Sequence, residues 1–143
     1  MKTLICSFLF LLACLSPLSA GAASVQNLSW SQVQEQVRQD PSQNIVIEFY
    51  RSTPDGLDCD RCEHQEAAFA ETAGKYDSRV LFVRVDAATA PRLKELGIVA
   101  IYPTHLFVRH NVPQGQEMVA RKVMGYVSAD DLSELIYEFF EIN

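Results

Sequence analysis

Cys59 and Cys62 are separated by two residues, at the point where an apolar segment gives way to a helical pattern. The apolar run 45–50 predicts a buried strand, and the pattern over 62–76 predicts a helix. Cys59 is therefore expected at the helix N-terminus, where unpaired N–H groups and the helix dipole stabilise a thiolate. Cys62 follows about one turn later and is placed to resolve a mixed disulfide. The two cysteines predict a redox-active dithiol.

The segment 1–23 has the order of a secretory signal: a basic start, an apolar middle and a run of small residues. Its apolar stretch is too short to span a bilayer. We expect cleavage after Ala20, Ala22 or Ala23, which leaves 24–143 as a single domain. The alternative is an N-terminal helix buried in the fold.

The leader also contains two of the four cysteines, Cys6 and Cys14. Residues 11–14 resemble a bacterial lipobox, although Leu12 is a poor match, and this alternative makes Cys14 a lipid-anchored N-terminus. Otherwise the chain is expected to be periplasmic or secreted, where disulfides persist. In either case Cys59 and Cys62 remain as the dithiol.

The net charge of −6 and a pI near 5.0 exclude a nucleic-acid-binding function, which needs a basic surface. The mature chain is of single-domain length and contains no repeat or linker, and we expect a monomer without a transmembrane span. On folding, a domain of this size buries about two-thirds of the surface that its unfolded chain exposes, so it needs no disulfide for stability.

Helical and strand patterns alternate along the mature chain. In order we expect a helix from Ser29 or Ser31 to Gln39, a strand at 45–50, the helix at 62–76, a strand at 80–85, a short helix from Pro91 to Gly97, a strand at 104–109, a strand at 119–127 broken at Gly125, and a last helix capped by Ser128 with Asp131. For the first helix, Gln32 or Gln34 completes the cap. This order predicts an α/β fold with helices on both faces of a sheet.

Glu48 and Arg84 are the only charged residues in their apolar strands. A buried carboxylate near Cys62 can act as the base that exchanges a proton with that thiol. Equally, Glu48 and Arg84 can form a buried ion pair that only satisfies both charges. Both interpretations stay open at this point.

Several short motifs occur in the order found in thioredoxins. They are Glu-Phe-Tyr at 48–50, Arg-Val-Asp-Ala at 84–87, Gly-Ile at 97–98, Tyr-Pro-Thr at 102–104, and Gly125 before the last helix. Together with the CDRC motif at 59–62 they make the mature chain resemble the thioredoxin superfamily over almost its whole length.

The resemblance implies a thioredoxin fold, with a central mixed sheet and helices on both faces. It implies Cys59 as the attacking thiol, Cys62 as the resolving thiol, and a disulfide between the two. It places Pro103 in the position of the cis-proline that faces this disulfide, with Tyr102 and Thr104 flanking the substrate. No cofactor or metal is implied.

Three departures from the family pattern concern the active-site region. The segment 51–58 makes the approach to Cys59 about five residues longer than in ordinary thioredoxins. The dipeptide between the cysteines is Asp-Arg, which differs from that of thioredoxins and of strong bacterial oxidants. One extra residue lies between Ile98 and Pro103. Glu48 and Arg84, in contrast, match the family's buried carboxylate and its basic partner.

The charges around Cys59 oppose one another. The helix dipole and Arg61 favour the thiolate, whereas Asp55, Asp58 and Asp60 disfavour it by like charge. Water and salt screen exposed carboxylates, so we expect the pKa of Cys59 only modestly below that of an ordinary thiol. A reductant or isomerase is therefore favoured over a strong oxidant.

The sequence thus predicts an exported oxidoreductase that exchanges disulfides with protein substrates and with an unidentified redox partner. One alternative is a copper-binding or copper-delivery protein, in which Cys59, Cys62 and a histidine bind the metal. Another is a non-catalytic binding module that recruits a partner through 51–58. A purely structural Cys59–Cys62 disulfide is disfavoured because so small a loop adds little stability.

Overall fold

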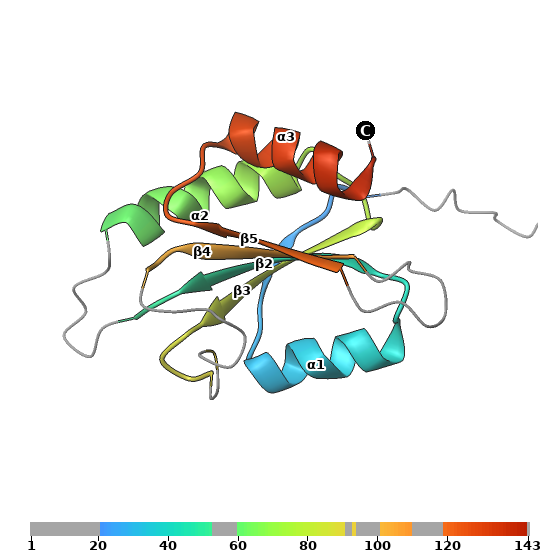
Figure 1. Cartoon of the computed structure of the whole chain (residues 1–143), viewed down its shortest axis with the longest axis horizontal. Helices are drawn as coiled ribbons and strands as arrows, with labels where there is room; N and C mark the ends of the chain where they lie inside the picture. Colours follow the sequence, from blue (N-terminus) through green and yellow to red (C-terminus); the bar gives the residue numbers. More distant parts are fainter. Residues whose placement is uncertain (1–20, 53–59, 91–92, 94–100, 110–118, 143) are drawn as a thin grey trace, which may run out of the picture.

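The computed structural model describes residues 21–52, 60–90, 93, 101–109 and 119–142. The elements are β1 (Val25–Asn27), α1 (Trp30–Gln39), β2 (Asn44–Tyr50), α2 (Asp60–Ala73), β3 (Val80–Asp86), β4 (Thr104–Arg109), β5 (Val119–Met124) and α3 (Ala129–Phe140). Figure 1 shows a central sheet with α1 on one face and α2 and α3 on the other. The predicted α/β class, with helices on both faces, is confirmed.

The sheet is mixed and has the strand order β1-β3-β2-β4-β5. β1 and β2 run parallel to β3, whereas β4 is antiparallel to β2 and β5 is antiparallel to β4. β2 lies at the centre and is covered on both faces, which explains its nearly continuous apolar sequence. Because β2 and β3 are parallel, their carboxyl ends meet at one edge of the sheet, where the candidate site lies.

Side chains of alternate strand residues build a separate core on each face of the sheet. On the α1 face, Ile45, Ile47 and Phe49 of β2 pack with Val33 of α1. The opposite core, under α2 and α3, contains Val46, Phe69, Phe82, Phe107, Leu132 and Ile136. Glu48 belongs to this second face, since it lies two residues after Val46.

Both predicted helix caps are present. Ser29 caps α1, and its partner in the capping box is Gln32, so the first of the two predicted registers is the one observed. Ser128 caps α3, where its side chain accepts a hydrogen bond from the backbone N–H of Asp131. These caps fix where the chain enters α1 and α3.

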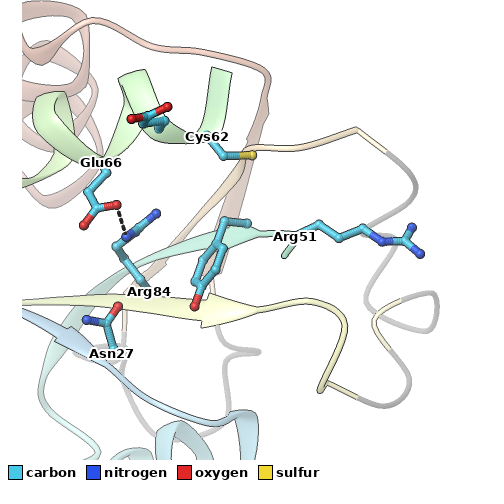
Figure 2. A pocket seen from close by; sticks show the side chains of 7 residues that line it. Asn27, Arg51, Cys62, Glu66 and Arg84 are labelled. Carbon is cyan, nitrogen blue, oxygen red and sulfur yellow. Dashed lines mark ion pairs between the residues drawn. The ribbon is translucent and has the colours of Figure 1, made fainter. Parts of the chain in front are cut away.

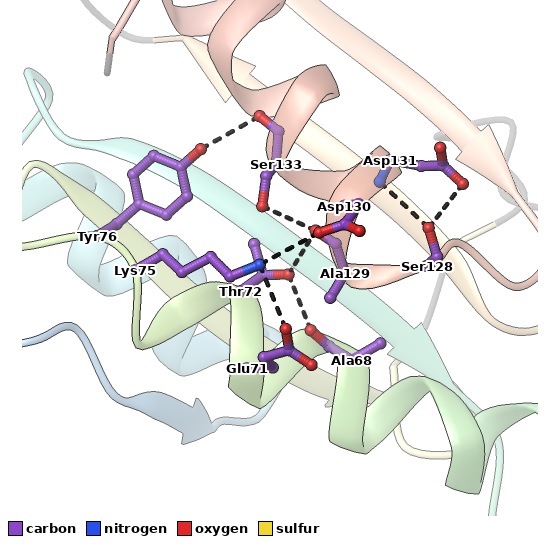
Figure 3. A network of polar contacts seen from close by, with 10 residues as sticks. All are labelled: Ala68, Glu71, Thr72, Lys75, Tyr76, Ser128, Ala129, Asp130, Asp131 and Ser133. Atoms are coloured by element: carbon purple, nitrogen blue, oxygen red, sulfur yellow. Dashed lines mark hydrogen bonds and ion pairs between the residues drawn. The ribbon is translucent and has the colours of Figure 1, made fainter.

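Polar contacts hold α2 against α3 (Figure 3). The Thr72 hydroxyl lies 3.2 Å from the carbonyl oxygen of Ala129, the first residue of α3. The Tyr76 hydroxyl donates to the carbonyl oxygen of Ser133 at 3.2 Å. The second half of α2 and the residues that follow it are therefore held against α3.

The structure differs from the sequence-based expectations in two elements. β1 was not predicted, because three residues with one apolar side chain give no strand pattern. The strand predicted at 119–127 with a break at Gly125 ends at Met124 instead, and Gly125 follows in a left-handed conformation with φ of 91°. The short helix predicted from Pro91 to Gly97 lies, except for residue 93, outside the described residues. No described helix has the length and apolar character needed to cross a bilayer.

Candidate redox site

Cys62 lies in the first turn of α2, with only 4% of its surface exposed. The helix begins at Asp60, so the sequence position of Cys59 directly precedes it. Cys59 itself lies outside the described residues, and the predicted disulfide with it. The description of the site therefore starts from Cys62 and the groups around it.

A row of polar residues crosses the sheet on the face that α2 and α3 cover. Asn27 pairs with Arg84, Arg84 pairs with Glu48, and Glu48 pairs with His105 on successive strands. Paired residues point to the same face, so these four side chains lie side by side. The neighbouring row on this face is apolar and contains Phe82. The polar row is therefore a local departure from an otherwise apolar core.

Arg84 makes three contacts: with Glu48 of this row, with Glu66 of α2 and with Tyr50 of β2. Its Nε lies 3.2 Å from Oε1 of the fully buried Glu48, and its Nη1 lies 2.8 Å from Oε2 of Glu66. Its guanidinium carbon lies 4.5 Å from the centre of the Tyr50 ring, a cation–π distance. Arg84 thus connects the buried carboxylate of β2 to the helix that carries Cys62.

The Glu48 carboxyl has an unusual proton affinity. Burial raises its pKa from the ordinary 4.5 to about 7, against the positive charge and hydrogen bond of Arg84, which lower the pKa. The negative charge of Glu66 adds a smaller upward contribution. Near neutral pH this carboxyl is therefore able both to accept and to release a proton.

A cavity of about 400 Å³ opens beside Cys62. It is lined by Asn27, Tyr50, Arg51, Cys62, Glu63, Glu66 and Arg84. Figure 2 shows the Cys62 side chain entering this space from α2, with the Arg84 side chain rising from β3 toward Glu66. The nearly buried Cys62 thiol and Arg84 guanidinium both lie at the wall of this cavity.

Tyr102, Pro103 and Thr104 form the turn that leads into β4. The peptide bond between Tyr102 and Pro103 is cis. The Thr104 hydroxyl donates to the carbonyl oxygen of Ile101 at 2.5 Å, and the Gly125 N–H donates to the carbonyl oxygen of Pro103 at 2.8 Å. The residues before β4 and after β5 are thereby held together.

Three large apolar side chains surround this turn and are about half exposed. They are Ile101 at 48%, Met124 at 51% and Tyr126 at 51%. Met124 pairs with Thr104 across β4 and β5. The turn therefore lies next to exposed apolar side chains.

The residues predicted from the sequence fall into two groups. Glu48 and Arg84 form an ion pair in the row beneath α2, and Arg84 shares the cavity with Cys62. Tyr102, Pro103 and Thr104 make up the second group, in the turn before β4. His64, on α2, is exposed.

Sequence reasoning missed other residues at the site. Gln65, Glu66 and His105 were given no role, although Glu66 binds Arg84 and His105 pairs with Glu48. One signal for His105 was available: it alternates with Phe107 in β4 and therefore lies on the same buried face. Among the described residues, no group of three or more histidine, cysteine, aspartate or glutamate side chains is placed to hold a metal ion.

The thioredoxin family model matches residues 24–138, which is most of the chain. The chain belongs to the thioredoxin family. No curated protein matches it. The family membership agrees with the mixed sheet and the helix arrangement described above.

Solved thioredoxin structures share this fold. Chloroplastic thioredoxin z matches with a TM-score of 0.67 at 17% identity, over 83% of this chain and 96% of that chain. Thioredoxin from Schistosoma mansoni matches with a TM-score of 0.64 at 20% identity, over 83% and 98% of the two chains. The short form of spinach chloroplast thioredoxin f gives 0.64 at 22% identity, over 85% and 97%.

Proposed function

We propose that the chain is an exported thiol-disulfide oxidoreductase that acts on protein substrates through Cys59 and Cys62. The observation that carries the proposal is the position of Cys62, which is buried at the start of α2 and shares a cavity with Arg84, the partner of Glu48. A thiol that must lose its proton during a reaction needs a nearby base whose pKa is close to neutral. Glu48 has a pKa of about 7, and its partner Arg84 lines the cavity that Cys62 lines.

The reaction has two exchange steps. The Cys59 thiolate attacks one sulfur of a substrate disulfide, forms a mixed disulfide and releases the other substrate sulfur as a thiolate. Glu48 then accepts the Cys62 proton, and the Cys62 thiolate attacks the Cys59 sulfur. This step forms the Cys59–Cys62 disulfide and releases the second substrate thiolate. Two electrons pass to the substrate, and a second dithiol must return them to the enzyme.

The apolar turn before β4 is the proposed substrate surface. A bound polypeptide lies across Tyr102, Pro103 and Thr104, with the exposed side chains of Ile101 and Met124 beside it. The chain is expected to be a reductant or isomerase, because three aspartates around Cys59 oppose the stabilisation of its thiolate.

The leader at 1–23 directs export to the periplasm or the outside of the cell, with a lipid anchor at Cys14 as the alternative outcome of processing. Ala23 is already part of the fold, since its N–H donates to the carbonyl oxygen of Tyr76 at 2.7 Å. This contact favours cleavage after Ala20 or Ala22, which keeps Ala23 in the mature domain. Mass determination of the exported protein identifies the site and any lipid.

Trapping of mixed disulfides tests the function. The Cys62→Ser variant, which keeps the attacking thiol, is expected to accumulate mixed disulfides with exported proteins on non-reducing gels. The matched Cys59→Ser variant is expected to trap none. Equal trapping by both variants contradicts the assigned roles, and failure of the wild-type protein to reduce insulin disulfides contradicts the activity.

A further inference from the structure

His105 is a fully buried polar residue with no role in the proposed reaction steps. It is the second residue of β4 and pairs directly with Glu48 of β2 in the antiparallel register. On its other side it pairs with Val123 of β5, and the Phe69 ring of α2 lies 6.1 Å from its own ring, centre to centre. An imidazole therefore stands beside the buried carboxylate, between apolar neighbours.

Polar atoms on both side chains lack hydrogen-bond partners. Within the described part of the chain, neither Oε2 of Glu48 nor either ring nitrogen of His105 has one. Buried polar groups in folded proteins are nearly always paired. Facing side chains on antiparallel strands have Cβ atoms about 4.5–5.5 Å apart, so a small side-chain rotation or one buried water joins the two groups.

The protonation states of the two groups are complementary. Burial lowers the pKa of His105 to about 4, partly opposed by a contact of the ring with the backbone of Val123 that falls outside hydrogen-bond geometry, so the ring is neutral near pH 7. A neutral imidazole carries one N–H donor. Ionised Glu48 uses Oε1 for Arg84 and leaves Oε2 as an acceptor.

Other titratable groups also surround Glu48. Arg84 on β3 lowers its pKa, and Glu66 on α2 raises it. Tyr50 is the next residue of β2 on the same face, and Cys62 of α2 opens into the cavity that Arg84 and Tyr50 line. On β5, the residue opposite His105 is the apolar Val123.

We propose that His105 is a positioning residue for Glu48, whose second carboxylate oxygen accepts the imidazole N–H. Arg84 and His105 then hold the carboxylate from the two neighbouring strands. This arrangement favours the ionised form of Glu48, which is the form that can take the proton of Cys62, and it orients the carboxylate. The inference deepens the proposed function and rests on the role given there to Glu48.

Replacing the imidazole donor is expected to change the pKa of Glu48 in a predictable direction. A hydrogen bond to the ionised form lowers the pKa of an acid, and apolar surroundings raise it. In His105→Leu both effects act together, so Glu48 titrates at higher pH, by about one pH unit or more. In His105→Gln the amide N–H replaces the imidazole donor, and most of this upward shift disappears.

The experiment is a ¹³C NMR titration of the Glu48 carboxyl in the reduced full chain, for wild type and for both His105 variants. Phe107→Leu is the matched control, because it removes a buried ring from the same face of the same strand without touching the polar row. The proposal expects a raised titration midpoint in His105→Leu, partial or full recovery in His105→Gln, and no shift in Phe107→Leu. An unchanged midpoint in His105→Leu, or an equal shift in Phe107→Leu, overturns it.

A second measurement needs no His105 variant and covers the case in which His105→Leu does not fold. In wild type, the imidazole ¹⁵N signals of His105 are expected to shift with the same midpoint as Glu48, and in Glu48→Gln this shift is lost. Independence of the two signals in wild type overturns the pairing. Neither NMR measurement requires a substrate, so failure of the pairing is distinguishable from failure of the proposed function, which disulfide trapping tests.

Discussion

Gln65 and Val127 form two opposed hydrogen bonds between α2 and the segment that leads into α3. The Gln65 side chain donates from Nε2 to the Val127 carbonyl oxygen at 3.0 Å, and its Oε1 accepts the Val127 N–H at 2.7 Å. Gln65 is fully buried and lies one turn after Cys62. Val127 follows Gly125, which binds the carbonyl oxygen of Pro103. The amide thus connects α2 to the turn that carries the proposed substrate surface.

Gln65→Met is expected to destabilise the protein, because it keeps the side-chain volume but leaves the N–H and carbonyl of Val127 without partners. Each buried unpaired group costs about 1–3 kcal/mol, so the free energy of unfolding falls by about 2–6 kcal/mol. Urea denaturation measures the loss. The matched control is His64→Met at the exposed neighbouring position, where we expect a change within about 0.5 kcal/mol. An equal loss of stability in the two variants would contradict a stabilising role for the Gln65–Val127 hydrogen bonds.

Glu48→Gln is expected to change how stability depends on pH. The pKa of Glu48 is about 7 in the folded protein and near 4.5 when unfolded, so between these values the folded state holds a proton that the unfolded state has lost. The free energy of unfolding of wild type therefore falls as pH rises through this window, by about 3 kcal/mol. Glu48→Gln lacks this contribution.

Urea denaturation at several pH values between 4 and 8 checks the Glu48 prediction. The difference between wild type and variant isolates the contribution of Glu48, because all other carboxyls are common to both. Glu71→Gln, on the exposed side of α2, serves as a control and is expected to follow the wild-type curve. Parallel curves for wild type and Glu48→Gln contradict the raised pKa.

Glu48 and Arg84 could be predicted from the sequence, whereas His105 could not be given a partner. A single charge in an otherwise apolar strand indicates a buried group that needs a partner, and the segments 45–50 and 80–85 each contain one such charge. The partner of His105 depends on the register between β4 and β2, and no turn signal in the sequence fixes that register. The Gln65 contact likewise joins residues 62 positions apart and carries no local signal.

β1 was missed for a different reason. Its three residues gain their strand conformation from pairing with β3, since Val25, Gln26 and Asn27 have no strong β pattern of their own. Gly125 was recognised as an interruption but not as the strand end. Its positive φ turns the chain away from β4, and pairing stops at Met124.

Arg84→Leu is expected to raise the pKa of Glu48 above 7, because it removes the charge and hydrogen bond that oppose the effect of burial. At pH 9 the buried carboxylate is then ionised without a cation beside it, and the loss of stability reaches about 3–5 kcal/mol. At pH 5 the carboxyl is protonated, so the loss is smaller. Arg84→Lys keeps a cation and should lose less at pH 9. If Arg84→Leu loses the same stability at both pH values, the loss comes from altered packing and not from the charge of Glu48.

The last prediction concerns the order in which the two thiols react. Cys62 is 4% exposed and lies inside the first turn of α2, so alkylation requires local opening of the helix. In the reduced protein, iodoacetamide is therefore expected to modify Cys62 at least about 100-fold more slowly than in the urea-unfolded chain, which corresponds to about 3 kcal/mol for opening. Mass mapping after brief treatment should show the label at Cys59, the residue expected to carry the more reactive thiolate. Denatured protein is the control, and there both thiols should be labelled at similar rates. Preferential labelling of Cys62 in the native protein would assign the attacking role to Cys62. Glu48 would then be the base for the first exchange step, in which the mixed disulfide forms, and not for its resolution.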